Sequence, residues 1–248
     1  MSVFITRGMR LSIPAGGLKI GLGPDGSEAS SVRFQVGISL FPIWLEVALR
    51  HLREAVAANA LLVSAHGKKE SDGIARALED EFTHGMQSIT ASATAIDAFY
   101  ASMKNFANFA ADELAAMGTN RTSRPVRIKE TLRRVFRLEA SPTAQLDAIL
   151  TKIYRFRDLA VHPAADQRDP VLHSVLQVGV EWRFVAFSYS NAHEILRESL
   201  SLLLQLLQKG AASGGPSKKE CEESLLLIEP ILSDWKGSFG TIDVSAKQ

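Results

Sequence analysis

Between residues 9 and 40, apolar and polar side chains alternate with a period of two, which is the pattern of β-strands that bury one face. Two such runs flank the turn-forming segment GPDGSEASS, and a shorter run precedes them. The pattern predicts a β-hairpin over residues 18–41, to which residues 9–13 could add a third strand. We expect residues 1–41 to form a small antiparallel sheet packed on the helices that follow, because so few strands are only marginally stable alone. The alternating apolar positions are Met9, Leu11, Ile13, Leu18, Ile20, Leu22, Val32, Phe34, Val36, Ile38 and Leu40.

From Pro42 onward, apolar residues recur every three or four positions, which predicts amphipathic helices. Pro42, Pro125 and Pro142 suit first helical turns, and Gly67 suits a helix end. The fold class is therefore mainly α, with a helical bundle over residues 42–209. The predicted helices span residues 42–67, 72–117, 124–136, 142–162 and 180–208, the second with an interruption near Gly85.

Residues 210–248 begin with GAASGGPS, whose glycines and serines are typical of a flexible linker. After it we expect one short helix that ends near Pro230, and then a polar tail. The chain contains no internal repeat that would indicate a repeat architecture.

Charge and cysteine content narrow the classes of partner. The 248 residues include 28 Lys and Arg against 27 Asp and Glu, so no net field draws the whole molecule to nucleic acid or membrane. Cys221 is the single cysteine, which excludes an intramolecular disulfide framework and a thiolate-rich zinc site and favours a reducing compartment. The start MSVFITRGMRLSIP has too short an apolar run for a signal peptide, and no apolar stretch is long enough to span a bilayer. We expect a soluble cytoplasmic protein without a membrane partner.

The chain offers no convincing cofactor or metal motif. The segment GLGPDG matches the glycine fingerprint of dinucleotide-binding loops, but a strand rather than a helix is predicted after it, so a hairpin turn is the better interpretation. The six histidines include no pair four residues apart, the helical spacing at which two imidazoles share a metal. We therefore expect neither cofactor nor metal.

The segment RFRDLAVHP, residues 155–163, places a charged side chain where the helical pattern expects an apolar one. On an ideal helix, Arg157 falls inside the apolar arc formed by residues 146, 149, 150, 153 and 160. A guanidinium there needs a carboxylate, a partner chain or a bound anion, because an unpaired buried charge is costly. Asp97 is the candidate internal partner. His162 ends the helix before Pro163, where the helix dipole favours a protonated imidazole.

An arginine that grips phosphate oxygens and a histidine that moves a proton form a pair suited to phosphodiester cleavage. Two further arginine-to-histidine matches occur, Arg155 to His162 and Arg168 to His173, but neither combines an apolar helical stripe with a helix end. On an ideal helix Arg157 and His162 lie about 140° apart. Either the helix end unwinds before Pro163, or a second copy completes the site.

The helical part of the chain resembles the HEPN superfamily of helical-bundle proteins, whose motif is an arginine, four to six intervening residues and then a histidine. Here RDLAVH supplies Arg157, Asp158 and His162, and Asp97 occupies a position that is often acidic in the family. The resemblance covers residues 42–208. It implies a homodimer whose two motifs face each other in a metal-independent endoribonuclease, as in toxin–antitoxin or antiviral defence systems. An antitoxin or sensor protein is then a further expected partner.

A basic run, NRTSRPVRIKETLRRVFR at residues 120–137, is opposed within its own sequence only by Glu130. Such clusters bind phosphate backbones without sequence preference, although they also serve as solvated helix faces. We expect this run to bind RNA. Its cations are Arg121, Arg124, Arg127, Lys129, Arg133, Arg134 and Arg137.

The resulting hypothesis is an RNA-cleaving dimer in which Arg157 holds the scissile phosphate and His162 transfers a proton at the 2′-OH or at the leaving oxygen. Asp158 or Asp97 would orient this pair. Two alternatives remain open: a catalytically inert module for dimerisation or protein binding, in which Arg157 ties two helices together through Asp97, and a module that binds a nucleotide or small anion at Arg157.

Overall fold

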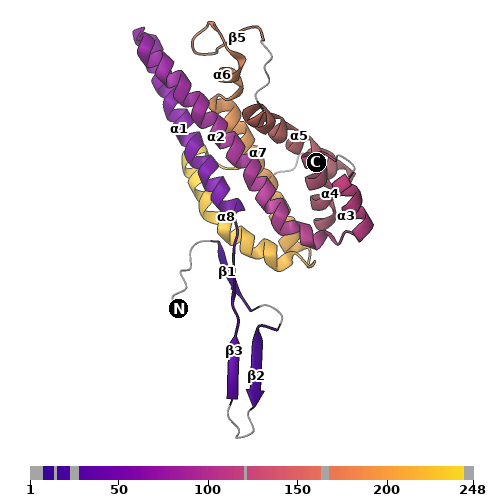
Figure 1. Ribbon diagram of the computed structural model, residues 1–248. Helices are drawn as coiled ribbons and strands as arrows, with labels where there is room; N and C mark the ends of the chain where they lie inside the picture. Colours follow the sequence, from indigo (N-terminus) through magenta and orange to yellow (C-terminus); the bar gives the residue numbers. More distant parts are fainter. Residues whose placement is uncertain (1–7, 14–15, 23–27, 120–121, 163–167, 243–248) are drawn as a thin grey trace. The chain divides into compact units, whose positions relative to one another are not determined.

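The computed structural model describes residues 8–13, 16–22, 28–119, 122–162 and 168–242 (Figure 1). The chain divides into two compact units, residues 1–40 and residues 41–248. The first contains strands and the second is mainly helical, which confirms the predicted fold class.

The first unit is an antiparallel ladder in two parts. Strands β1 (Met9–Ser12) and β4 (Gln35–Ile38) pair with each other, as do β2 (Leu18–Leu22) and β3 (Glu28–Val32). Between the two parts, five residues, 13–17, intervene on one arm and two, 33–34, on the other. Residues 9–12 therefore form the expected strand, but they extend the same hairpin instead of adding a third strand beside it. The packing of this unit on the helices stays a prediction.

The helical unit begins with a long antiparallel hairpin of α1 (Phe41–Lys68) and α2 (Ser71–Met103). Lys69 makes the turn in the left-handed conformation, with φ 60°. Small residues let the two helices approach closely, and the Ser88 hydroxyl donates to the Ala48 carbonyl at 2.9 Å. The predicted interruption near Gly85 is wrong, because α2 runs through this residue. Gly85 lies against the backbone carbonyl of Phe187, where a side chain would collide.

The predicted helix over residues 72–117 is divided in two. A single 3-10 turn, η1 (Lys104–Ala107), ends at Asn108, whose φ of 48° reverses the backbone direction, and α3 (Ala111–Thr119) follows. Helices α4 (Arg124–Val135) and α5 (Ala140–Val161) lie close to their predicted positions, with Pro125 in the first turn of α4.

The predicted helix over residues 180–208 is also divided. A short hairpin of β5 (Val171–Leu172) and β6 (Gly179–Val180) leads into α6 (Trp182–Ala186), and α7 (Tyr189–Ala212) starts after a break. The break is fixed from another element, because the buried Glu81 carboxylate accepts the Tyr189 backbone N–H at 2.9 Å and the Asn59 amide at 3.0 Å. Sequence-local signals cannot reveal such a contact.

The last helix, α8 (Lys218–Phe239), continues through Pro230, so its predicted end near that residue is wrong. Pro230 itself is exposed, whereas Ile231 and Trp235 beyond it are buried against the rest of the unit. Their burial, about 2 kcal/mol for each large side chain, offsets the hydrogen bond that the proline removes. Residues 213–217 separate α7 from α8, so most of the expected linker lies outside the helices and α7 covers only its first three residues.

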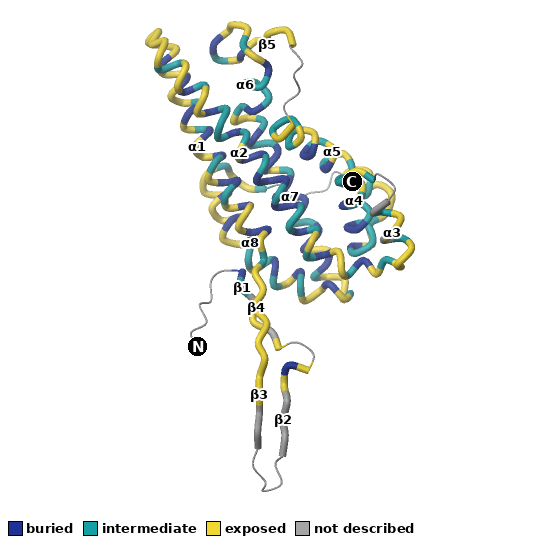
Figure 2. Tube along the Cα trace, in the orientation of Figure 1, coloured by how far each residue is buried: buried dark blue, intermediate teal, exposed yellow. Residues whose placement is uncertain are grey.

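The core lies where α1, α2, α4, α5, α7 and α8 turn their apolar faces toward one another (Figure 2). None of the helices in the described part of the chain combines the length and apolar character needed to cross a membrane. Fully buried core side chains include Leu45, Leu52, Ile89, Ile96, Phe99, Ile128, Leu132, Leu150, Ile153, Leu200, Leu207 and Ile228.

Candidate active site at the end of helix α5

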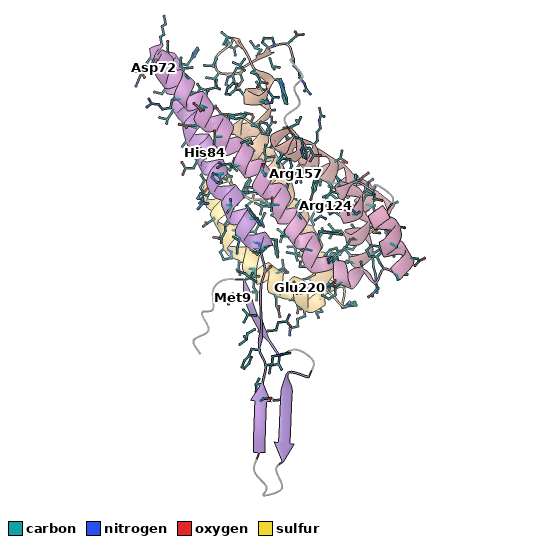
Figure 3. The ribbon with its side chains drawn as sticks, viewed as in Figure 1. Met9, Asp72, His84, Arg124, Arg157 and Glu220 are labelled. Carbon is teal, nitrogen blue, oxygen red and sulfur yellow. The ribbon has the colours of Figure 1, made fainter. Side chains whose placement is uncertain are left out.

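Arg157 lies near the C-terminal end of α5, with 38% of its side chain exposed (Figure 3). Its guanidinium Nη1 donates to the neighbouring Asp158 carboxylate at 3.0 Å. The predicted ion pair between Arg157 and Asp97 is therefore wrong. The fully buried positions of α5 end at Tyr154, one turn before Arg157, so the face on which the ideal-helix projection placed the arginine is only partly buried at this point.

Asp97 belongs to a different cluster, which joins α2, α4 and α5. Its Oδ1 accepts from the Arg124 Nε and from the Tyr154 hydroxyl, each at 2.6 Å. Burial, followed by the hydrogen bond to Asp97, raises the pKa of the Tyr154 phenol well above its usual range. The cluster explains why an acid stands at residue 97, and it leaves Arg157 without an internal carboxylate partner from another helix among the described residues.

His162 is exposed and stands at the point where α5 ends. Its backbone N–H still donates to the Asp158 carbonyl at 2.9 Å, but its φ of −125° and ψ of 76° are not helical. His162 is therefore the first residue of this segment to leave the helical conformation. Asp158 contributes to both residues, through its carboxylate to Arg157 and through its carbonyl to His162.

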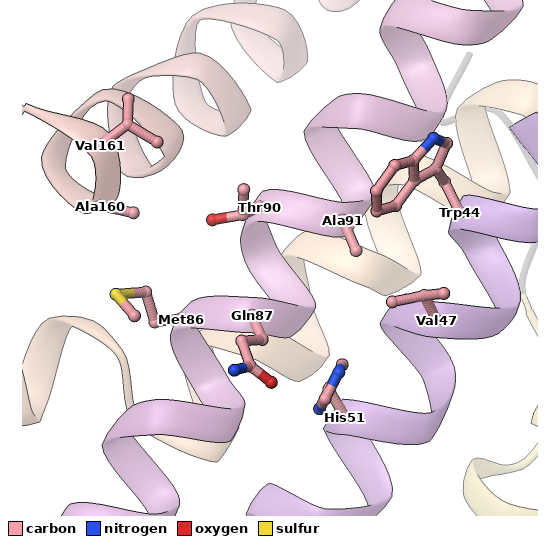
Figure 4. A pocket seen from close by; sticks show the side chains of 9 residues that line it. All are labelled: Trp44, Val47, His51, Met86, Gln87, Thr90, Ala91, Ala160 and Val161. Atoms are coloured by element: carbon pink, nitrogen blue, oxygen red, sulfur yellow. The ribbon is translucent and has the colours of Figure 1, made fainter.

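A cavity of about 380 Å³ adjoins this helix end (Figure 4). Ala160 and Val161, which directly precede His162, line one side, and Trp44 and His51 of α1 line the other. Residues of α2, including Gln87 and Thr90, lie between them. Trp44 is 36% exposed.

His51 forms a pair with His84 across the hairpin of α1 and α2. Their Nδ1 atoms are 3.2 Å apart, and the rings stack with centroids 5.4 Å apart. Burial, then the positive charges of His84 and Arg50, lower the pKa of His51, so its neutral form is favoured. Neither histidine stands out in the sequence, where 33 positions separate them. Their similar distances from the turn at Lys69 were a usable signal, since such residues face each other in an antiparallel helical hairpin.

The basic run is largely neutralised by carboxylates from other elements. Arg124 pairs with Asp97, and Lys129 pairs with Asp147 at 3.0 Å. Arg133 and Arg134 share Glu130, and Arg134 also bonds Glu113 at 2.6 Å. Arginine hydrogen bonds to these two glutamates, reinforced at Glu113 by the Ala110 backbone N–H, lower the pKa of each to about 2. Arg137 is exposed and Arg127 is half-buried, while Arg121 lies outside the described residues.

The match between Arg168 and His173 is accounted for by local packing and hydrogen bonds. His173 is buried in the hairpin of β5 and β6, and its Nδ1 accepts backbone N–H groups from Val175 and Leu176 at 3.3 and 3.4 Å. Arg168 stacks on the Trp182 ring instead, with its guanidinium carbon 4.3 Å from the ring centroid.

Comparisons of the chain with models of protein families, with curated proteins and with solved structures find no match. The likeness to the HEPN superfamily therefore stays a prediction that rests on the motif residues. In the described part of the chain, no group of three or more His, Cys, Asp or Glu side chains is placed to hold a metal ion.

Proposed function

We propose that this protein is a HEPN-type endoribonuclease whose active site is built at the end of α5 and completed by a second copy of the chain. The observation that carries the proposal is the availability of Arg157. Its guanidinium is bonded only to the adjacent Asp158 among the described residues, and more than a third of the side chain is exposed. An arginine in this position is free to exchange a weak surface contact for a phosphate group.

The chemistry follows from the two side chains of the motif. Arg157 would hold the non-bridging oxygens of the scissile phosphate and stabilise the charge that develops on them. One imidazole takes the proton of the ribose 2′-OH as the 2′-oxygen bonds to phosphorus. A second imidazole gives a proton to the 5′-oxygen as the P–O5′ bond breaks. The products are a 2′,3′-cyclic phosphate and a 5′-hydroxyl, so the substrate must be RNA.

This reaction needs one proton acceptor and one proton donor, whereas the motif of one chain carries a single histidine, His162. A twofold axis near the end of α5 would bring together two copies of Arg157 and His162. The exposed apolar residues Trp44 and Val161, which line the cavity beside the motif, favour such a contact, because apolar groups around a site mark protein interfaces. A nucleobase next to the scissile phosphate could stack on Trp44.

The test is cleavage of end-labelled single-stranded RNA by purified protein, with mass spectrometry of the product ends. We expect 2′,3′-cyclic phosphate ends, no cleavage of DNA, and loss of at least about 100-fold in rate for Arg157→Gln or His162→Asn. Arg155→Gln is the matched control, because Arg155 is an exposed arginine on the same helix. Full activity of the Arg157→Gln, His162→Asn double variant would refute the proposal.

The molar mass of the protein, measured by light scattering as it elutes from a size-exclusion column, tests the composite site separately. We expect a dimer at the concentrations at which RNA is cleaved, and an active monomer would contradict a shared site. The same exposed apolar residues also favour the second candidate, an inert module for dimerisation or for an antitoxin or sensor partner. A dimer that cleaves no RNA and is unaffected by Arg157→Gln would support that candidate.

A further inference from the structure

A second cavity, of about 540 Å³, lies beside the C-terminal end of α2. Its walls come from the end of α2, from η1, and from α3 and α4, and it shares no residue with the cavity beside α5. Its volume lies within the range of small-molecule sites. Residues that define it include Tyr100, Lys104, Asn105, Asn108, Arg127 and Thr131.

Two polar groups of this cavity wall are buried without a hydrogen-bond partner among the described residues. They are the Nε of Arg127 and the hydroxyl of Thr131, a residue that is fully buried. Both residues lie on one face of α4, four positions apart. Buried polar groups are almost always satisfied, because leaving them unpaired costs stability. Neither atom is open to solvent, so these groups make the cavity wall polar, and a ligand in the cavity would meet Arg127 through its other atoms.

The charge of the cavity is positive. Lys104 and Arg127 both line it, and no acidic side chain does so among the described residues. The contrast with the rest of α4 is informative, since Arg124, Lys129, Arg133 and Arg134 all have carboxylate partners. Arg127 stands among them without a carboxylate partner in the described part of the chain, which is the arrangement expected where an anion binds.

The remaining walls fit a flat ring with a polar edge. Tyr100 and Phe109 contribute aromatic rings, and each is backed by an arginine, Arg124 at 4.8 Å and Arg134 at 4.4 Å from the ring centroid. The side-chain amides of Asn105 and Asn108 offer both donors and acceptors. Such a combination of rings and amides recognises a heterocyclic base by stacking and by hydrogen bonds.

We propose that this cavity binds a nucleoside monophosphate, with the phosphate on Arg127 and Lys104 and the base among Tyr100, Phe109 and the two asparagines. The ligand is a small molecule and not an RNA strand, because the donors and rings converge on one cavity of limited volume instead of following a groove. This site is separate from Arg157 and His162, so the proposal does not depend on nuclease activity.

Isothermal titration calorimetry of the full chain tests the proposal, using the four ribonucleoside monophosphates, adenosine and inorganic phosphate as probes. We expect at least one monophosphate to bind, and to bind at least about tenfold more tightly than either adenosine or phosphate, since both halves of the ligand are recognised. Absence of binding by all four monophosphates overturns the proposal. Equal affinity for inorganic phosphate overturns the assignment of a base site.

Variants then place the ligand. Arg127→Gln should weaken binding at least about tenfold, and Lys104→Gln, at an exposed residue that does not threaten folding, should weaken it in the same direction. Arg137→Gln is the control, because Arg137 is an exposed arginine just beyond α4 that does not line the cavity. An equal loss in Arg137→Gln would show general electrostatic attraction and would overturn the site. Tight binding of a short RNA without binding of monophosphates would overturn it in favour of a strand-binding surface.

Discussion

At the scale of single residues, the position of an arginine on a helix did not determine its partner. The helical arc predicted that Arg157 points inward, but the buried part of α5 ends at Tyr154, and the hydrophobic pattern does not show where packing stops. Asp97 was predicted to pair with Arg157, and this prediction is wrong. The partner of Asp97, Arg124, comes from the run that was expected to bind RNA. Tertiary contacts between helices decided both outcomes.

This difference predicts opposite stability effects for two charged residues. Asp97→Ala leaves the Arg124 guanidinium and the buried Tyr154 hydroxyl without their acceptor, so it should lower the free energy of unfolding by about 1–3 kcal/mol. Arg157→Gln removes only a surface contact with Asp158 and should change it by less than about 0.5 kcal/mol. Urea denaturation followed by circular dichroism measures both. A large loss in Arg157→Gln would restore a structural role for Arg157.

At the scale of elements, helix starts could be predicted and several helix ends and breaks could not. Pro42, Pro125 and Pro142 act locally, so the beginnings of α1, α4 and α5 follow from the sequence. The break before α7 depends on Glu81, which lies more than one hundred residues earlier in the chain. The continuation of α8 beyond Pro230 depends on burial of Trp235. These features arise from packing between elements and leave no local sequence signal.

Gly85 gives a test of packing against intrinsic helix propensity. Alanine is favoured over glycine within helices by about 1 kcal/mol, so propensity alone predicts that Gly85→Ala stabilises the protein. A methyl group at this position would collide with the Phe187 backbone carbonyl, which cannot move aside as a flexible side chain would. We therefore expect a loss of about 1–3 kcal/mol in the free energy of unfolding.

The matched control for this comparison is Gly67→Ala, near the end of α1, where an added methyl group meets only open space. It should leave the protein equally stable or up to about 1 kcal/mol more stable. Thermal and urea denaturation of the two variants would separate the effects. If both variants gained stability, α2 and the break before α7 would not be in close contact at Gly85.

At the scale of the whole chain, the nearly balanced net charge does not show which charged residues pair with one another. The basic run was predicted to bind RNA from its own residues alone. Glu113, Asp147 and Asp97 reach it from other elements and pair with its cations, which the run itself does not show. The same holds for the histidines, whose spacing along the chain excluded a helical metal pair but did not show that His51 meets His84 or that His193 packs on Trp235 and Phe239. Their surroundings set how stability depends on pH.

Stability should fall as the pH drops from about 7.5 to about 5.5. Burial, then His84 and Arg50, lower the pKa of His51, and burial, then Arg197, lower the pKa of His193. A histidine in an unfolded chain titrates near about 6.5. Below that pH the unfolded chain binds protons that the folded protein resists, so the free energy of unfolding decreases as the solution becomes more acidic.

Urea denaturation at pH 7.5, 6.5 and 5.5 measures this slope, and a His51→Gln, His193→Gln double variant should remove most of it. The paired glutamates do not account for a change in this range. The pKa values of Glu113 and Glu130 are lowered to about 2, so the stability that they contribute is lost only at pH values below their unfolded values. Stability that stayed constant between pH 7.5 and 5.5, or a double variant with an unchanged slope, would show that neither imidazole is held in its neutral form by the fold.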